Sequence, residues 1–252
     1  MIEDLPLHAT AFLILFARVG SVLMLLPVFS EDAVPAQIRL FAGMGMTLGL
    51  WSFLSAKVIP IADVTDIQLA GILVAELLVG IGLGLIMRIM YQAISIAGSL
   101  ISLQIGLTSA MVFDPGQSGQ APILSKFVGV AAAVVCFAMA VHHLWLGALI
   151  KSYGLFPVGV VPNSHDFAQL AVKVAGNSLA LGVSLAAPLL VYGIVFNTVL
   201  GLVARVAPAL QVFFIAQPLN LLLGITIAAA TFGATLVTFA NSIAMWMNMG
   251  WS

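Results

Sequence analysis

Charged residues are scarce in this chain of 252 residues, and their scarcity excludes most kinds of soluble protein. Only 7% of the residues are charged, whereas 62% are hydrophobic. A soluble domain carries roughly 25% charged and 45–50% apolar residues, because polar side chains must cover its surface. The composition therefore excludes an ordinary soluble enzyme, a disordered chain and a nucleic-acid binder with a basic face. It favours an integral membrane protein, and the mean hydropathy of +1.20 agrees.

Cysteine is nearly missing, and the first residues do not have the pattern expected of a leader sequence. Cys136 is the one cysteine, so no disulfide forms within the chain, and its place in an apolar run indicates a small hydrophobe. A secretory signal peptide needs a positive stretch before its apolar core, whereas this chain begins Met1-Ile2-Glu3-Asp4. We therefore expect the first apolar segment to stay in the protein as a membrane span. The net charge of −1 indicates no partner.

Apolar runs of about 20 residues, the length that crosses a bilayer, occupy most of the chain. We expect helical segments at about residues 7–29, 37–59 and 123–150. Strands are not expected, because the strands of a membrane barrel alternate apolar and polar residues and these runs are continuously apolar. The sequence predicts an all-α membrane protein with six to seven apolar helical segments in one domain, residues 1–252.

Two regions are too long for one span. Residues 67–112, 46 in number, would make a rod of about 69 Å, whereas a bilayer core is about 30 Å thick. They form either two helices or one helix that projects well beyond the lipid. Residues 174–204 and 206–252 contain no Asp, Glu, Lys or Arg. They supply either about three spans or two long helices joined near Pro208.

Four charged residues lie within apolar runs: Arg18, Glu76, Arg88 and Arg205. A charge at the bilayer centre costs roughly 2.5–3.5 kcal/mol, so each is a candidate functional residue unless it reaches the interface from a segment end. The segment end is favoured for Arg205, which is followed closely by Pro208. Glu76 and Arg88 cannot pair along one straight helix, because they lie about 18 Å apart and about 120° around its axis. Each needs a partner on another segment or subunit.

Motifs for catalysis or cofactor binding are not apparent. His142 and His143 point about 100° apart on a regular helix, so they cannot both bind one metal ion. An interfacial histidine pair is favoured over a proton relay. Gly80, Gly82 and Gly84 have no strand before them, so they indicate helix packing rather than a phosphate-binding loop. We expect no enzymatic activity, no metal and no cofactor.

Residues 113–122 form the longest clearly non-helical stretch, with two glycines, two prolines and four polar side chains. Irregular backbone at membrane depth is tolerated only where protein buries it or where it lines a wet cavity. The alternative is an ordinary surface loop.

Short motifs occur in a fixed order over about residues 15–225. They are Arg18, Leu26-Pro27-Val28-Phe29-Ser30 and Val34-Pro35, then Glu76-Leu77-Leu78-Val79-Gly80, Leu83-Gly84, Ala97-Gly98, Gln104-Ile105-Gly106-Leu107-Thr108 and Asp114-Pro115, then His142-His143-Leu144 and Phe156-Pro157-Val158-Gly159, and last Leu200-Gly201-Leu202, Arg205, Ala207-Pro208, Val212-Phe213 and Pro218-Leu219. In this order and spacing they resemble the flagellar biosynthetic protein FliR family of the type III export gate. The flagellar branch matches better than its virulence-secretion relatives, which usually carry an Asp-Asn-Gln-Arg-Gly-type motif where Asp114-Pro115-Gly116-Gln117-Ser118 stands. The chain departs from the family at Pro208-Ala209 and Ala216-Gln217-Pro218-Leu219.

The resemblance implies a subunit of the flagellar protein-export gate, located in the bacterial inner membrane within the flagellar basal body. About residues 1–165 would then be FliP-like, and about residues 166–252 would form a FliQ-like helical hairpin. The implied partners are FliP-like and FliQ-like subunits in a hetero-oligomeric helical complex, FlhB and FlhA, unfolded flagellar export substrates and membrane lipid, but no nucleic acid. The four intramembrane charges would find partners across subunit interfaces.

The resemblance also implies that the irregular loop helps to plug the export channel. Carried onto this chain, the plug falls at residues 106–122, with Met111, Val112 and Phe113 as its apolar seal. Glycines permit the turns of such a loop, and Met and Phe can close a narrow passage by excluding water. The predicted gate residues are Gly106, Met111, Val112, Phe113, Asp114, Pro115, Gly116, Gln117, Gly119 and Pro122.

A stand-alone secondary transporter or channel is the alternative. It predicts an inverted repeat with a polar site at the membrane midplane. Leu83-Gly84-Leu85-Ile86-Met87-Arg88 resembles Leu200-Gly201-Leu202-Val203-Ala204-Arg205, which is the one hint of such a repeat.

Overall fold

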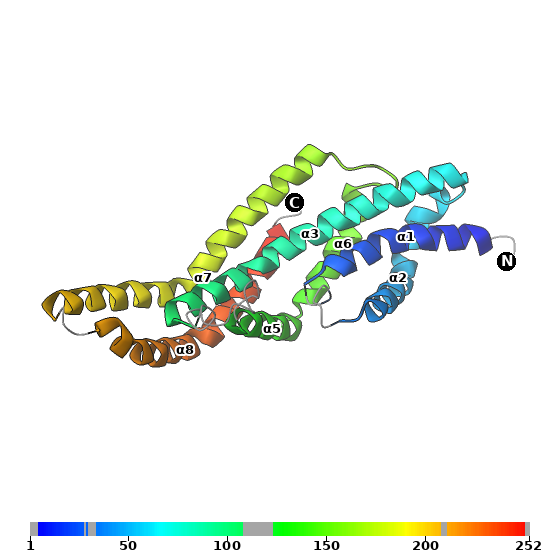
Figure 1. The fold of residues 1–252 in the computed structure, drawn as a ribbon. Coiled ribbons are helices and arrows are strands. Elements are labelled where there is room, and N and C mark those ends of the chain that lie inside the picture. Colours follow the sequence, from blue (N-terminus) through cyan, green and yellow to red (C-terminus); the bar gives the residue numbers. More distant parts are fainter. Residues whose placement is uncertain (1–4, 28, 30–33, 108–122, 208–210, 250–252) are drawn as a thin grey trace. The chain divides into compact units, whose positions relative to one another are not determined.

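Every regular element that the computed structural model describes is a helix (Figure 1). The structure describes residues 5–27, 29, 34–107, 123–207 and 211–249. The helices are α1 (Leu5–Leu25), α2 (Ala36–Val58), η1 (Ile59–Ile61), α3 (Asp66–Ile105), α5 (Ile123–Ala138), α6 (Val141–Leu155), α7 (Ser164–Val206) and α8 (Val212–Met249). The predicted all-α fold with six to seven helical segments is confirmed for this part of the chain.

Five of these helices are long and apolar enough to cross a membrane. They are Leu5–Leu25, Ala36–Ile61, Asp66–Ile105, Ser164–Val206 and Ile215–Asn248. α3 and α7 have 40 and 43 residues, so the path along each helix axis is about 60 Å or more, roughly twice the thickness of a bilayer core, and α7 contains Pro188. The long apolar run after residue 66 is therefore one helix that exceeds the lipid, and the charge-free C-terminal runs are two long helices.

The expected helical segment at residues 123–150 is divided into two helices, α5 and α6, which pass as one candidate span when they are taken together. α5 ends at Ala138 and α6 begins at Val141. Ala140 has a φ of 58°, in the left-handed region that residues other than glycine rarely adopt. Neither proline nor glycine marks this break, so an apolar run alone does not reveal it.

Two helix starts are held by side chains at or beside the first turn. Before α3, Gln68 Oε1 accepts hydrogen bonds from the backbone N–H and the hydroxyl of Thr65, at 3.1 and 3.0 Å. Before α7, Asn163 Oδ1 accepts the backbone N–H of His165 at 3.1 Å. Such caps satisfy amides that have no partner within the helix, and they fix where each helix begins.

The chain divides into two compact units. Unit 1 comprises Met1–Met90, His142–Ala175 and Met247–Ser252, and unit 2 comprises Tyr91–Val141 and Gly176–Trp246. α3 and α7 contribute residues to both units. The division into a FliP-like part and a FliQ-like hairpin follows the family resemblance rather than these contacts, and it stays a prediction.

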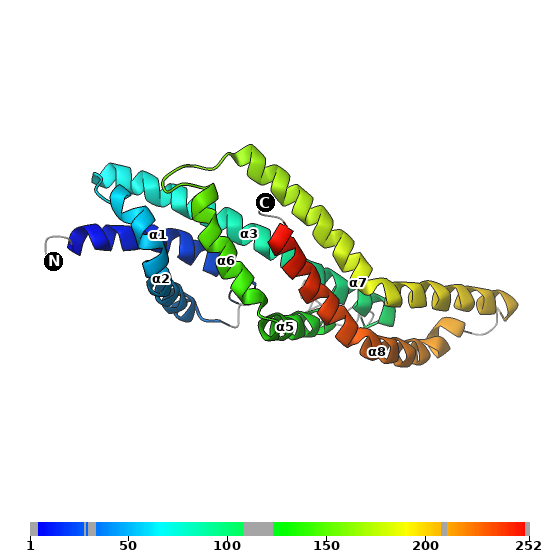
Figure 2. The same ribbon diagram turned by 180° about the vertical axis from the view of Figure 1, so that it is seen from behind.

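In unit 1, α1 lies beside the first part of α3, as both ribbon views show (Figure 1, Figure 2). Glycines on α3 make this closeness possible. A Cβ atom at Gly80 would lie 2.7 Å from the carbonyl oxygen of Arg18, and one at Gly84 would lie 3.2 Å from that of Val22. These contacts confirm that the glycine motif serves helix packing.

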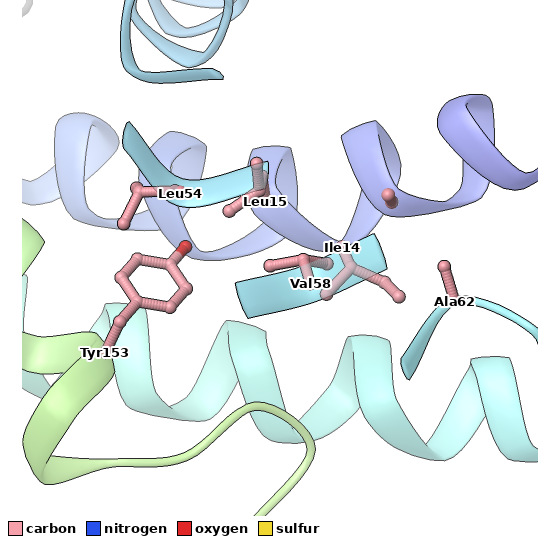
Figure 3. Close-up of a cluster of buried hydrophobic side chains, with 7 residues drawn as sticks. Ile14, Leu15, Leu54, Val58, Ala62 and Tyr153 are labelled. Carbon is pink, nitrogen blue, oxygen red and sulfur yellow. The ribbon is translucent and has the colours of Figure 1, made fainter. Parts of the chain in front are cut away.

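The core of unit 1 is a cluster of buried apolar side chains from α1, α2 and α6, together with the residue after η1 (Figure 3). Its members are Ala11, Ile14, Leu15, Leu54, Val58, Ala62 and Tyr153. In apolar surroundings such side chains hold helices together by close van der Waals packing rather than by removal from water. The cluster holds the three helices in place around the Tyr153 ring, which also borders the polar site described below.

In unit 2, α5, α7 and α8 pack on the second part of α3 at backbone distance. A Cβ atom at Gly98 would lie 2.7 Å from the Cα atom of Ser125 on α5, and one at Gly224 would lie 3.2 Å from that of Ile105. The part of α7 in this unit and α8 run side by side as a helical hairpin (Figure 2). The glycines therefore let α5 and the hairpin reach the end of α3.

Candidate functional site

Arg18 on α1 and Glu76 on α3 form a buried ion pair in unit 1. Both side chains have 0% of their surface exposed. Arg18 Nη2 donates a hydrogen bond to Glu76 Oε1 at 2.8 Å, and Arg18 Nε lies 2.7 Å from Glu76 Oε2. Two parallel contacts between a planar guanidinium and a carboxylate are stronger and more directional than one. Since either charge alone would be costly to bury, each stabilises the other.

Further hydrogen bonds join this ion pair to the end of α6 and the turn after it. Arg18 Nη2 donates to the carbonyl oxygen of Phe156 at 3.1 Å, and Nη1 lies 3.4 Å from Ser152 Oγ. The backbone N–H of Gly159 donates to Glu76 Oε1 at 3.1 Å. Gly159 has a φ of 78°, a conformation that glycine adopts readily. The ion pair thus pins this turn to α1 and α3.

Tyr153 closes one face of the arginine. The Cζ atom of Arg18 lies 4.0 Å from the centroid of the Tyr153 ring, which is within the range of a cation–π interaction. The guanidinium is therefore bounded by a carboxylate at its edge and by an aromatic ring on its face. Both charges are buried and face each other, so this arrangement can lock three helices together.

Glu76 has its partner on another segment, which is one of the two alternatives that its spacing from Arg88 left open. The resemblance implied partners across subunit interfaces, whereas these two residues pair within one chain. Spacing excluded a pair of Glu76 with Arg88 along one helix, and both do lie on α3, but spacing does not reveal which helices meet. Ser152, Phe156 and Gly159 were not expected in the site. The motif Phe156-Pro157-Val158-Gly159 was noted in the sequence, but no role was predicted for it.

Arg88 and Arg205 lie apart from this site. Both side chains are exposed, and neither has an ion-pair partner among the residues that the structure describes. Arg205 is in the last turn of α7, as expected for a charge near a segment end, where the helix dipole favours a cation. Partners for Arg88 and Arg205 on other subunits stay a prediction.

Of the predicted gate loop, the structure describes only Gly106 and the residue after it. Gly106 has a φ of 87°, and its N–H donates to the carbonyl oxygen of Leu103 at 3.1 Å. The N–H of Leu107 donates to the carbonyl oxygen of Ser102 at 3.1 Å. These two bonds form a Schellman motif that ends α3. The predicted residues outside the described part are Met111, Val112, Phe113, Asp114, Pro115, Gly116, Gln117, Gly119 and Pro122.

Gly106→Ala should weaken the end of α3. A side chain at this φ costs about 1–2 kcal/mol, so we expect a lower unfolding temperature of the detergent-solubilised protein. Gly129→Ala on α5 is the control, because a Cβ atom there meets nothing within 4 Å, and it should be neutral or slightly stabilising. Equal stability of the two variants would contradict the prediction that a side chain at position 106 strains the backbone.

The long apolar helices and the charges paired inside the chain define an integral all-α membrane protein. Residues 9–245 match the family model described as "Bacterial export proteins, family 1". The Flagellar biosynthetic protein FliR of Caulobacter vibrioides is 36% identical over 226 residues, which cover 88% of this chain and 90% of that protein.

Two further relatives carry the same name. The protein from Escherichia coli is 35% identical over 216 residues, 84% of this chain and 80% of that protein. The protein from Bacillus subtilis is 30% identical over 214 residues, 84% of this chain and 82% of that protein. This chain therefore belongs to family 1 of the bacterial export proteins, the family of the flagellar biosynthetic proteins FliR, and is a membrane component of flagellar export. The predicted family is confirmed.

Proposed function

We propose that this protein forms part of the wall of the flagellar protein-export channel in the bacterial inner membrane, and that residues 106–122 help to plug it. The observation that carries the proposal is the position of the two helices in unit 2 that precede and follow this segment. α3 ends at Ile105, α5 begins at Ile123, and Ser125 packs directly on Gly98 of α3. The segment thus leaves one helix and returns to it, which gives a plug a fixed base.

Exposed apolar surface supports a place inside an assembly. Val191, Ile194 and Leu222 on the α7–α8 hairpin are 61%, 67% and 65% exposed. Helices about twice as long as the bilayer core carry part of such surface beyond the lipid, where other protein must cover it. We infer that FliP-like and FliQ-like subunits cover it, with FlhB and FlhA nearby. The division at about residue 165 into FliP-like and FliQ-like parts belongs to the same proposal.

The proposed role is structural rather than enzymatic. Arg18 and Glu76 neutralise each other, so the charged site described in unit 1 serves to hold helices and not to transform a substrate. Unfolded flagellar proteins would pass along the channel without a cofactor held by this chain. A stand-alone transporter is less favoured, because the two similar motifs at residues 83–88 and 200–205 do not occupy equivalent places in their helices. Arg88 lies in the middle of α3, whereas Arg205 lies in the last turn of α7.

Deletion of residues 112–120 tests the plug. We expect the complex with its partner subunits to assemble and cells that produce it to leak small ions, because the apolar seal is shortened. The measurement is the ion permeability of such cells, with co-purification of the partner subunits as the check on assembly. A second variant replaces the same residues with glycine and serine, so that loop length stays while the seal is lost. Normal permeability in both assembled variants would refute the plug role.

A further inference from the structure

Asn220 on α8 caps the end of α3 in unit 2. The last four carbonyl groups of an α-helix have no partner within it. In α3 the first two of these, on Ser102 and Leu103, accept the bonds of the Schellman motif. Asn220 Nδ2 donates to the remaining two, the carbonyl oxygens of Gln104 and Ile105, at 3.2 Å each. One side chain from a distant part of the chain thus completes the end of the helix.

Tyr192 on α7 orients this amide. Its hydroxyl donates to Asn220 Oδ1 at 2.9 Å and lies 3.2 Å from the backbone oxygen of the same residue. Because the carbonyl groups of α3 only accept hydrogen bonds, the Nδ2 group faces them, and Oδ1 is left to accept from the Tyr192 hydroxyl. The Tyr192 hydroxyl, the Asn220 amide and the carbonyl groups at the end of α3 thus connect α3, α7 and α8 by hydrogen bonds.

Two glycines bring the helices close enough for this contact. A Cβ atom at Gly193, next to Tyr192, would lie 2.7 Å from Cδ of Gln104. A Cβ atom at Gly224, one turn after Asn220, would lie 2.9 Å from Cγ1 of Ile105. Both glycines therefore flank the residues whose carbonyls Asn220 binds. Backbone carbonyls left open in apolar surroundings are costly, so the cap favours one position of the helix end.

We propose that Asn220, oriented by Tyr192, positions Gly106 and Leu107 and so couples the α7–α8 hairpin to the start of the gate loop. This inference rests on the proposed function of that loop. Gly106 directly follows the carbonyls that Asn220 holds, and its own N–H is part of the same helix end. A shift of α8 along α3 would therefore be transmitted to the first residues of the loop.

The test uses a cysteine at position 107 in the intact complex. In a Cys136→Ala background, Leu107→Cys is labelled with a maleimide, with and without Asn220→Ala. We expect Asn220→Ala to raise the labelling rate roughly tenfold and to make cells leak ions, with assembly retained. Tyr192→Phe should have a smaller effect in the same direction, because it removes only the orienting group.

Asn197→Ala is the matched control. Asn197 lies on α7 and donates to the carbonyl oxygen of Gly193 at 2.8 Å, within its own helix, so this variant should label and retain ions as the wild type does. The proposal would be overturned if Asn220→Ala left the labelling rate of the cysteine at position 107 at the wild-type value. It would also be overturned if Asn197→Ala raised that rate as much as Asn220→Ala does. Faster labelling of Asn220→Ala without an ion leak would also overturn the proposal, because the helix end would then have no effect on the gate. A leak on deletion of residues 112–120 in the same cells would then leave the plug role standing.

Discussion

Arg18→Met is expected to destabilise unit 1 by about 3–5 kcal/mol, because it leaves the Glu76 carboxylate buried without its counter-charge. The side chain of Glu76 has no exposed surface and, among the described residues, keeps the N–H of Gly159 as its donor. The unfolding temperature of the detergent-solubilised complex measures the loss. Faster proteolysis at the turn after α6 should accompany it, because Arg18 also holds the carbonyl oxygen of Phe156.

A double variant separates charge from packing. Arg18→Met combined with Glu76→Leu should recover most of the stability, because apolar residues of similar volume often replace a buried ion pair without loss. Lys173→Met is the control for removal of a cation, and we expect an effect within about 0.5 kcal/mol, because the side chain is exposed. Wild-type stability of Arg18→Met would show that the pair contributes nothing. A double variant no better than Arg18→Met would show that the hydrogen bonds to the turn, rather than the charges, dominate.

Gly80→Val is expected to disrupt the contact of α1 with α3, with a loss of about 1–3 kcal/mol or more. A Cβ atom at Gly80 would lie 2.7 Å from the carbonyl oxygen of Arg18 and would also overlap the Ser21 side chain. The carbonyl belongs to the helix backbone and cannot rotate aside, so the helices must separate. Because Glu76 lies one turn away on α3, the ion pair should lengthen as well.

Gly71→Val on the same helix is the matched control, since a Cβ atom there meets nothing within 4 Å. It should behave like the wild type in thermal unfolding of the purified complex. Ser21→Ala removes the movable part of the clash and should not rescue Gly80→Val, because the Arg18 carbonyl remains. Rescue by Ser21→Ala would mean that the side-chain contact, and not the backbone contact, limits the approach.

The helical architecture was predictable where hydrophobicity alone sets the structure. Continuous apolar runs predicted α1 and α2, and two long helices such as α7 and α8 were one of two alternatives for the C-terminal runs, because a helix is the form in which such a run satisfies its own backbone. The break at Ala140, which has a φ of 58°, was not predictable, because neither proline nor glycine marks it. Gly106 was predicted at the start of the gate loop, and it does end α3.

Composition and periodicity alone specify an apolar helical membrane protein, and the order of short motifs specifies its family. Those properties are local, so they can be read along the chain. Tertiary structure alone decided that Arg18 meets Glu76, 58 residues away, and that Asn220 caps a helix end 115 residues before it. Such pairings depend on which faces of two helices touch and on glycines such as Gly80 and Gly224 that let them approach. In uniformly apolar helices the residue pattern leaves that choice open, because every face is nearly equally hydrophobic.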